Sequence, residues 1–441
     1  MPGERLLLGI DIGTSGCKAT LFTQGGQAVG AGYGGYELIR PQESFVEQDP
    51  ERWWSATVAA TREAMRGVQP DRVAAVGLSS ANALVLVDRD GAALGPAIMQ
   101  LDRRAVQEAE DVERSMAGDP EPGRLYARPQ AGPHWLPTLL WLSRHEPDRW
   151  RRLHGLLFPS GWVCLRMTGV AAVDSSRAST TLLFDREHRD WDDQVADRFH
   201  IPTSWLPRLV DGSEITGTLR AGPAGELGLP GGIPVTVGAM DSVAAAFGVG
   251  GPVQGELVLI LGTTARALTA SPEWQTPVGT LSCALPGASD NLVMAVAWGF
   301  GTRVRDAASV WTATPDFSHL DDRLRSRAAG LPAGSERDVQ ALAIVDTAMT
   351  DLVEKAELLQ HVSPAPWSAL TVTGGAARVK GIVAGIEDRF GIPARVRHEA
   401  DAETRGAAML AGVATGWFAN VPDAVGAMSG NPGGSPVALG A

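Results

Sequence analysis

The chain has 441 residues, of which 44% are hydrophobic and 20% charged, the composition of an ordinary globular protein. This length exceeds what one hydrophobic core usually serves, so we expect two domains of about 200 residues each. The formal net charge of −12 argues against a nucleic acid or an anionic membrane surface as partner. No long apolar run indicates a membrane span.

Three cysteines, Cys17, Cys164 and Cys283, are widely spaced and odd in number. This pattern favours a reducing compartment over a disulfide framework or a zinc site. The first residues also lack the charged and apolar regions of an export signal. We therefore expect a cytoplasmic protein.

The first predicted element is an apolar strand that ends on an acid, in the stretch LLLGIDIGTSGCKATL at 6–21. A turn with Thr14 and Ser15 follows, and the next apolar run carries Lys18. Glycine lets a backbone approach phosphate, hydroxyls donate hydrogen bonds to its oxygens, and a lysine adds positive charge. Asp11 would then hold Mg²⁺, because a carboxylate does not bind phosphate directly. The alternative is a tight hairpin turn with a solvated aspartate.

The next segments predict a helix and two buried strands. DPERWWSATVAATREAMRGV at 49–68 has Asp49 in the N-cap position and Pro50 as the first helical residue. VAAVGLSS at 73–80 and ALVLVDRDGAAL at 83–94 are predicted to be strands of the interior.

From Gly232 the opening pattern returns. IPVTVGAMDSVAAAFGVG at 233–250 predicts a strand that runs into a small-residue helix. GELVLILGTTARALTA at 255–270 predicts an apolar strand, a Gly-Thr-Thr turn and a second apolar strand. We therefore expect two related halves, each presenting a Gly-Thr turn with backbone N–H groups and hydroxyls to a cleft.

Asp241 lies at the predicted start of the helix in this second pattern. An N-cap aspartate is one explanation for its position. A general base that accepts a proton from a sugar hydroxyl during phosphoryl transfer needs the same placement. The sequence pattern leaves both explanations open.

The last predicted elements are a strand, a glycine turn and two helices. ALTVTGGAARVKG at 369–381 predicts the strand and the turn, but it lacks the glycine spacing of a dinucleotide fold or a P-loop. ETRGAAMLAGVATGW at 403–417 predicts a helix whose small residues allow close packing.

Taken in order, these segments resemble the FGGY carbohydrate kinases, the group of xylulokinase, gluconokinase and glycerol kinase. The resemblance extends over nearly the whole chain, and it rests on the ordered set of motifs. The matching segments are DIGTSGCK, EQDPERWW, PAIMQLDRRA, VDSSRASTTLLFD, GAMDSVAAAFG, GTT and GGAARVKGIVAGIEDRFGIP.

The resemblance implies an α/β fold with two RNase H-like domains of the actin, sugar kinase and Hsp70 type and an interdomain cleft. We expect an N-terminal domain at 1–240, a shortened C-terminal domain at 241–420 and a flexible tail at 421–441. A homodimer is the assembly that the resemblance suggests.

The resemblance also assigns roles to individual residues. It makes Asp241 the general base and Asp11 the carboxylate that serves Mg²⁺. The residues expected to contact the phosphates of ATP are Thr14, Ser15, Lys18, Gly262, Thr263 and Thr264. The residues expected to line the adenosine site are Gly374, Gly375 and Ala376. The positions at which the family touches its sugar are Asn82, Gln100, Asp102 and Asp241.

The implied activity is ATP-dependent phosphorylation of a hydroxyl on a small carbohydrate, such as a pentulose, a sugar acid or a polyol. Two departures leave the sugar open, because the stretch SSANALVLVD has no histidine and Gln100 replaces a tryptophan of the family. Two other functions stay under consideration. One is a catalytically weak relative that senses sugar or nucleotide, and the other is an ATPase that acts on protein partners.

Overall fold

The computed structural model describes residues 4–117, 128–251, 254–332, 334–363, 365–397 and 401–429. The chain divides into two compact units. The first comprises Met1–Gly248, Cys283–Ser289 and Asp401–Ala441, and the second comprises Val249–Ser282 and Asp290–Ala400. From the sequence, we expect the boundary between the two domains at residue 240. The division seen here differs, because helices α9 (Asp241–Gly248) and α14 (Ala402–Ala414) belong to the first unit.

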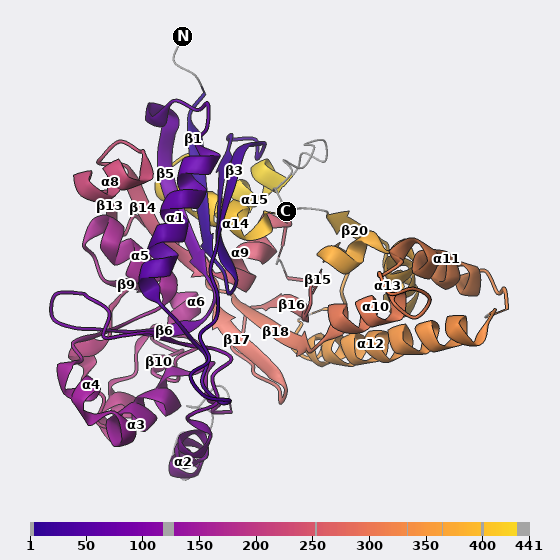
Figure 1. Cartoon of the computed structure of the whole chain (residues 1–441), viewed down its shortest axis with the longest axis horizontal. Coiled ribbons are helices and arrows are strands. Elements are labelled where there is room, and N and C mark those ends of the chain that lie inside the picture. The colour runs from indigo at the N-terminus through magenta and orange to yellow at the C-terminus, as the bar shows by residue number, and fades with distance from the viewer. Residues whose placement is uncertain are drawn as a thin grey trace. The chain divides into compact units, whose positions relative to one another are not determined.

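The first unit is built on a six-stranded sheet with the order β13-β14-β5-β1-β2-β3 (Figure 1). β1, β2 and β3 form an antiparallel meander, whereas β5 and β14 run parallel to β1. The strands are β1 Leu6–Ile12, β2 Gly16–Phe22, β3 Ala28–Gly35, β5 Val73–Ser80, β13 Gly217–Thr218 and β14 Pro234–Met240. A smaller sheet has the order β4-β7-β6-β8, with β4 Glu47–Gln48, β6 Ala83–Val87, β7 Ala97–Met99 and β8 Gly155–Leu157.

The second unit repeats this strand arrangement. Its sheet has the order β17-β18-β16-β15-β19-β20, again with an antiparallel meander followed by two strands parallel to the first. The strands are β15 Glu256–Leu261, β16 Ala265–Ser271, β17 Thr280–Ala284, β18 Asn291–Ala297, β19 Ala369–Thr373 and β20 Ala394–Arg397. The last two residues of β17 are assigned to the first unit. The prediction of two related halves in an α/β protein is therefore confirmed.

Helices cover the sheets. In the first unit, α1 (Pro50–Ala64) and α5 (Pro159–Thr168) pack on one face of the sheet, and α9 and α14 pack on the other (Figure 1). In the second unit the core lies between the sheet and the helices α10 Phe300–Ala308, α11 Phe317–Ala328, α12 Glu336–Gln360 and α13 Lys380–Phe390. Asp49 caps α1 as predicted, by accepting a hydrogen bond of 3.0 Å from the N–H of Glu51. No helix in the described ranges is long and apolar enough to cross a membrane.

The helix α14 lies directly against the backbone of the central strands. A Cβ added to Gly9 would stand 1.8 Å from the carbonyl oxygen of Thr404, and one added to Gly77 would stand 1.9 Å from that of Ala407. The contact extends to α9, because a Cβ on Gly406 would meet the carbonyl oxygen of Ala244 at 1.9 Å. The small residues of this helix therefore allow the close packing that the sequence predicts.

The prediction of a flexible tail at 421–441 is wrong for its first part. Residues Val421–Ser429 form helix α15, in which Val421, Ala424 and Met428 are buried. Arg405 of α14 ties this helix down by donating a hydrogen bond of 2.9 Å to the carbonyl oxygen of Met428. The apolar residues at helical spacing give α15 a buried face, and residues 430–441 lie outside the described residues.

We predict that Gly77→Ala destabilises the protein by about 3 kcal/mol or more, because the new methyl group overlaps the α14 backbone, which has no room to move. Gly225→Ala is the matched control, since Gly225 lies in helix α8 (Ala221–Leu227) with nothing within 4 Å of an added Cβ. The control should stabilise by about 0.5–1 kcal/mol. Urea denaturation measures both, and equal stabilities of the two variants would contradict the packing argument.

Candidate active site

Asp11 is the next-to-last residue of β1, a strand that is buried along its whole length, and Asp11 itself is 4% exposed. Its Oδ1 accepts a hydrogen bond of 2.6 Å from the hydroxyl of Ser79, which lies opposite it on β5. Burial and the negative charge of Glu403 raise the pKa of Asp11 to about 7. An acid in this environment gains from a nearby cation, because a positive charge offsets the cost of ionising it.

Lys18 is the cation closest to this acid along the sheet, since it pairs with Asp11 in the register of β1 and β2. Its ammonium group lies 3.5 Å from a carboxylate oxygen of Glu403, the second residue of α14. The charge of Glu403 raises the pKa of Lys18, so the side chain stays protonated. The position of Lys18 therefore depends on where α14 packs.

The turn between β1 and β2 is fixed by the protein around it. The N–H of Gly13 donates to the carbonyl of Gly16 at 3.0 Å, and the hydroxyl of Tyr36 donates to the carbonyl of Gly13 at 2.7 Å. The carbonyl of Thr14 accepts a hydrogen bond of 2.7 Å from the amide of Gln48. These bonds use carbonyl groups. The hydroxyls of Thr14 and Ser15 make no hydrogen bond to the described part of the protein, so they are available to a ligand.

Asp241 stands where β14 becomes α9, and its side chain is 23% exposed. β1, β5 and β14 run parallel, and Ile12 pairs with Ser80, which pairs with Met240. Asp11 and Asp241 therefore lie at the same edge of the sheet, where the carboxyl ends of these strands meet. The charge of Asp241 contributes to the raised pKa of Asp11, which agrees with their proximity.

A bulge in β14 directs the chain into this position. The pairing of β14 with β5 shifts between Thr236 and Ala239, and Gly238 lies there with φ of 71°. A Cβ on Gly238 would stand 1.7 Å from the carbonyl oxygen of Leu78, so only glycine fits. Bulges of this kind often re-aim a side chain beside a functional site.

The two oxygens of Asp241 have different surroundings. Oδ1 accepts hydrogen bonds from the N–H of Ser242 at 2.7 Å and from its hydroxyl at 3.1 Å. Oδ1 also lies 3.6 Å from the guanidinium group of Arg177. In the described part of the chain Oδ2 has no hydrogen bond. Asp241 is the first residue of α9, and its Oδ1 bonds only to the next residue, Ser242, so its side chain does not cap the helix as an N-cap aspartate would. Its Oδ2 has the chemistry to accept a proton.

The residues expected at the sugar have mixed surroundings. The amide of Asn82 donates to the carbonyl of Pro133 at 2.8 Å, while its buried Oδ1 has no partner among the described residues. The N–H of Gln100 donates to the carbonyl of Asn82 at 3.1 Å, so these two residues are adjacent. Asp102 is different, because Arg104 binds both of its oxygens, at 2.9 and 2.8 Å, and Val46 donates to it at 2.7 Å. A sugar hydroxyl would have to compete with these bonds for Asp102.

His134 was not expected from the sequence, although it lies next to the segment that Asn82 contacts. Its Nδ1 accepts a hydrogen bond of 3.0 Å from the N–H of Gln130, and its buried Nε2 has no partner in the described ranges. Burial lowers the pKa of His134 to about 4. The ring is therefore neutral at pH 7, with a proton on Nε2 that is available to an acceptor.

The motifs of the second unit also lie together. β15 and β19 are parallel and in contact, so the Gly262–Thr264 turn and the Gly374–Ala376 turn follow neighbouring strand ends. Gly374 has φ of 97°, and a Cβ there would lie 2.7 Å from the carbonyl oxygen of Leu261. The start of α10 also contacts the first of these turns, which the sequence did not predict. The N–H of Gly301, in the first turn of α10, donates to the carbonyl of Thr263 at 3.1 Å.

The geometry defines the chemistry that each unit can support. The first unit places two acids, a lysine and a hydroxyl-bearing turn at one sheet edge, and the second unit places two glycine-containing turns at an equivalent edge. Groups of this kind bind phosphate and transfer protons to and from hydroxyls. The molecule is thus a two-unit α/β protein in which these polar groups gather at the strand ends.

Residues 6–248 match the N-terminal domain of the FGGY family of carbohydrate kinases. The chain belongs to this family. The resemblance and the α/β fold of the sugar kinase type that it implies are confirmed.

Relatives and solved structures agree with this assignment. The chain is 34% identical to the xylulose kinase of Escherichia coli strain K12 over 260 residues, which is 59% of this chain and 53% of that protein. It therefore aligns with only about half the length of that relative. The xylulose kinase of Bacillus subtilis strain 168 is 25% identical over 95% of this chain and 90% of its own length. The crystal structure of a xylulose kinase from Rhodospirillum rubrum shares the fold, with a TM-score of 0.88, 20% identity and coverage of 96% of this chain and 92% of that one.

We predict that His134 makes the protein acid-sensitive. Its folded pKa of about 4 lies below the ordinary value of 6.5, so its contribution to stability is complete above pH 6.5 and is lost as the pH falls toward 4. His134→Asn keeps an acceptor for the N–H of Gln130 but cannot take up a proton. Between pH 7.5 and 4.5 the variant should lose about 2–3 kcal/mol less stability than the wild type.

Denaturant unfolding at the two pH values measures this difference, and the exposed His154, changed to Asn, serves as the control. An equal acid-induced loss in the wild type and in His134→Asn would show that His134 is not the buried neutral group described above.

Proposed function

We propose that this protein transfers the γ-phosphoryl group of ATP to a hydroxyl of a small carbohydrate of the pentulose, sugar acid or polyol class. The observation that carries this proposal is the state of Asp241. It lies at the sheet edge beside Asp11, with one oxygen bound by its own helix and the other free of hydrogen bonds within the described residues. Membership of the FGGY family supports the same activity.

In the proposed reaction Asp241 acts on the acceptor. Its free oxygen accepts the hydroxyl proton while the hydroxyl oxygen forms a bond to the γ-phosphorus and the bond to ADP breaks. Asn82 and Gln100 would hold the acceptor through their amide groups. The bidentate bonds between Asp102 and Arg104 suggest that Asp102 supports the local backbone as much as it supports the sugar.

ATP would be held by the groups that the sequence singles out. Thr14, Ser15 and Lys18 suit its phosphates because they offer hydroxyls and a protonated ammonium group. The backbone amides and hydroxyls of Gly262, Thr263 and Thr264 offer donors of the same kind. Gly374, Gly375 and Ala376 would present a surface without large side chains to the adenosine group.

The residues around Asp11 suit Mg²⁺. Only one oxygen of Asp11 receives a hydrogen bond from the described protein, and burial makes its negative charge costly, so a divalent cation would stabilise the ionised form. No group of three or more acids, histidines or cysteines in the described residues is arranged to hold a metal alone. A Mg²⁺ ion that arrives with nucleotide phosphates needs few protein ligands, and it would neutralise charge on the phosphates.

The expected location and assembly are part of the proposal. Three free and buried cysteines, together with the use of ATP, fit a cytoplasmic enzyme. The homodimer that the resemblance suggests stays a prediction.

The direct test is an ADP-release assay with Mg·ATP against a panel of ketoses, aldoses, sugar acids and polyols. We expect ADP formation that depends on one class of acceptor. ADP released equally without any acceptor would indicate an ATPase. Nucleotide binding without turnover on the whole panel would indicate a sensor, and either result would overturn the proposal.

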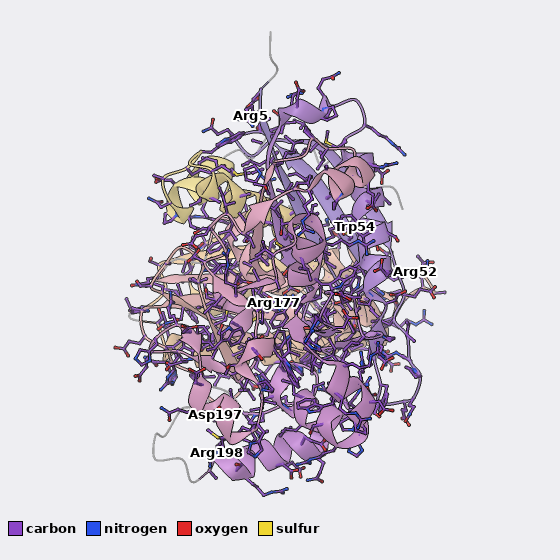
Figure 2. All side chains as sticks on the ribbon, turned by 90° about the vertical axis from the view of Figure 1, so that its left-hand side faces the viewer. Arg5, Arg52, Trp54, Arg177, Asp197 and Arg198 are labelled. Atoms are coloured by element: carbon purple, nitrogen blue, oxygen red, sulfur yellow. The ribbon has the colours of Figure 1, made fainter. Side chains whose placement is uncertain are left out.

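We predict that Asp241→Asn lowers the turnover number by a factor of about 100 or more, because the amide cannot accept the hydroxyl proton. The affinity for ATP should change little, since the nucleotide is assigned to other residues. Asp197→Asn, at an exposed position labelled in Figure 2, is the control for loss of a carboxylate and should keep full activity. Turnover near the wild-type value in Asp241→Asn would remove the general-base role.

We predict that Asp11→Ala weakens the use of Mg²⁺. The Mg²⁺ concentration for half-maximal rate should rise by a factor of about ten or more, because a carboxylate that supports the metal is lost. Ser79→Ala is the matched control, since it removes the hydroxyl that bonds to Asp11 but keeps the carboxylate. A Mg²⁺ titration curve that is the same in Asp11→Ala and the wild type would refute the role.

A further inference from the structure

Arg177 is one of the largest fully buried side chains in the described part of the chain. It lies on the short helix α6 (Ser175–Ala178) and is 1% exposed, and its guanidinium group stands 5.5 Å from the centre of the Phe158 ring. Figure 2 labels it together with the exposed Arg52. Among the described residues Arg177 forms an ion pair with Asp241 alone, at 3.6 Å. The cation therefore faces the proposed general base.

A chain of hydrogen bonds fixes Arg177 relative to Asp241. Asp174, at the end of β9 (Ala172–Asp174), caps α6 by accepting from the N–H groups of Ser176 at 2.8 Å and of Arg177 at 3.2 Å. The hydroxyl of Ser176 in turn accepts a hydrogen bond of 3.0 Å from the N–H of Met240. Since Met240 precedes Asp241, α6 is tied directly to the end of the strand that carries the acid.

Arg177 lacks the hydrogen bonds that a guanidinium group in a stabilising buried ion pair makes. Its Nε and Nη2 are buried and have no hydrogen-bond partner among the described residues, and burial lowers its pKa. Arg104 is the internal comparison, because it binds both oxygens of Asp102, at 2.9 and 2.8 Å, and also Glu47 at 2.6 Å. Burying a guanidinium group without its hydrogen bonds costs free energy. Arg177 is therefore not arranged to maximise stability.

Several acids surround this cation. The charged and titratable groups that act on Arg177 are Asp241, Asp174, Asp11 and the thiol of Cys283, which come from four different segments of the first unit. Neighbouring acids disfavour ionisation of a carboxylate, and a nearby cation favours it. Within the described ranges, Arg177 is the cation that pairs with Asp241, so it is placed to fix the orientation of that carboxylate.

We propose that Arg177 is a positioning residue for the phosphoryl transfer, and that its guanidinium group holds the Asp241 carboxylate turned toward the acceptor. This inference rests on the proposed kinase function. It extends that function by assigning a role to a residue that contacts neither nucleotide nor sugar in the scheme above.

The test compares Arg177→Gln, Arg177→Met and Arg177→Lys by acceptor-dependent ADP release at pH 7.5. The two neutral variants should lose turnover by a factor of about ten or more, with the KM for ATP nearly unchanged, because they misplace the carboxylate that acts on the acceptor and not the groups assigned to the nucleotide. Arg177→Lys keeps the positive charge beside Asp241, and it should recover most of the turnover that the glutamine variant loses.

Arg52→Met is the matched control, because Arg52 is an exposed arginine on α1 and should not affect the rate (Figure 2). If Arg177→Met does not fold, the comparison of Arg177→Gln with Arg177→Lys still decides. A loss that appears in the KM for ATP and not in turnover, or a lysine variant as impaired as the glutamine variant, would overturn the role of Arg177. A wild type that is inactive with every acceptor would instead refute the proposed function, so the two failures are distinguishable.

Discussion

The close approach of α14 to the central strands is the constraint on which the first unit depends. Because Gly9 and Gly77 have no side chains, the carbonyl oxygens of Thr404 and Ala407 reach the backbone of β1 and β5. This approach places Glu403, one residue before Thr404, within 3.5 Å of Lys18. The pKa of Asp11 depends on both of these charges. A packing feature made of glycines and alanines therefore sets the electrostatics of the proposed phosphate-handling edge.

The same edge is acidic in its free state. The described acids Asp11, Asp174, Asp241 and Glu403 lie near the cations Lys18 and Arg177, and burial raises the pKa of Asp11 to about 7 and that of Asp174 to about 6. Such an edge is unfavourable for a polyphosphate alone, because like charges repel. It is much better suited to a nucleotide that carries a divalent cation. The distribution of charge thus connects the proposed use of Mg·ATP to the arrangement of the acids.

Local patterns predicted a large part of this structure. The N-cap at Asp49, the junction at Asp241 and the repeated Gly-Thr turns all follow from spacing within one segment, and the structure has each of them where the pattern indicates. The proposed role of Arg177 could not be predicted from the sequence, because it depends on a short helix that a long-range hydrogen bond holds against Met240. The bulge at Gly238 and the bonds between Asp102 and Arg104 also depend on tertiary contacts. Helix α15 was not predicted, although Val421, Ala424 and Met428 have the spacing of a helix with one buried face.

The central claim is that a phosphoryl group passes from ATP to a carbohydrate hydroxyl and not to water. The most direct measurement follows the ³¹P NMR spectrum of Mg·ATP incubated with the protein, with and without the acceptor class that supports ADP release. The account predicts that the γ-phosphate signal is replaced by that of a sugar phosphomonoester only when the acceptor is present. Conversion of the γ-phosphate to inorganic phosphate at the same rate in both samples would contradict it.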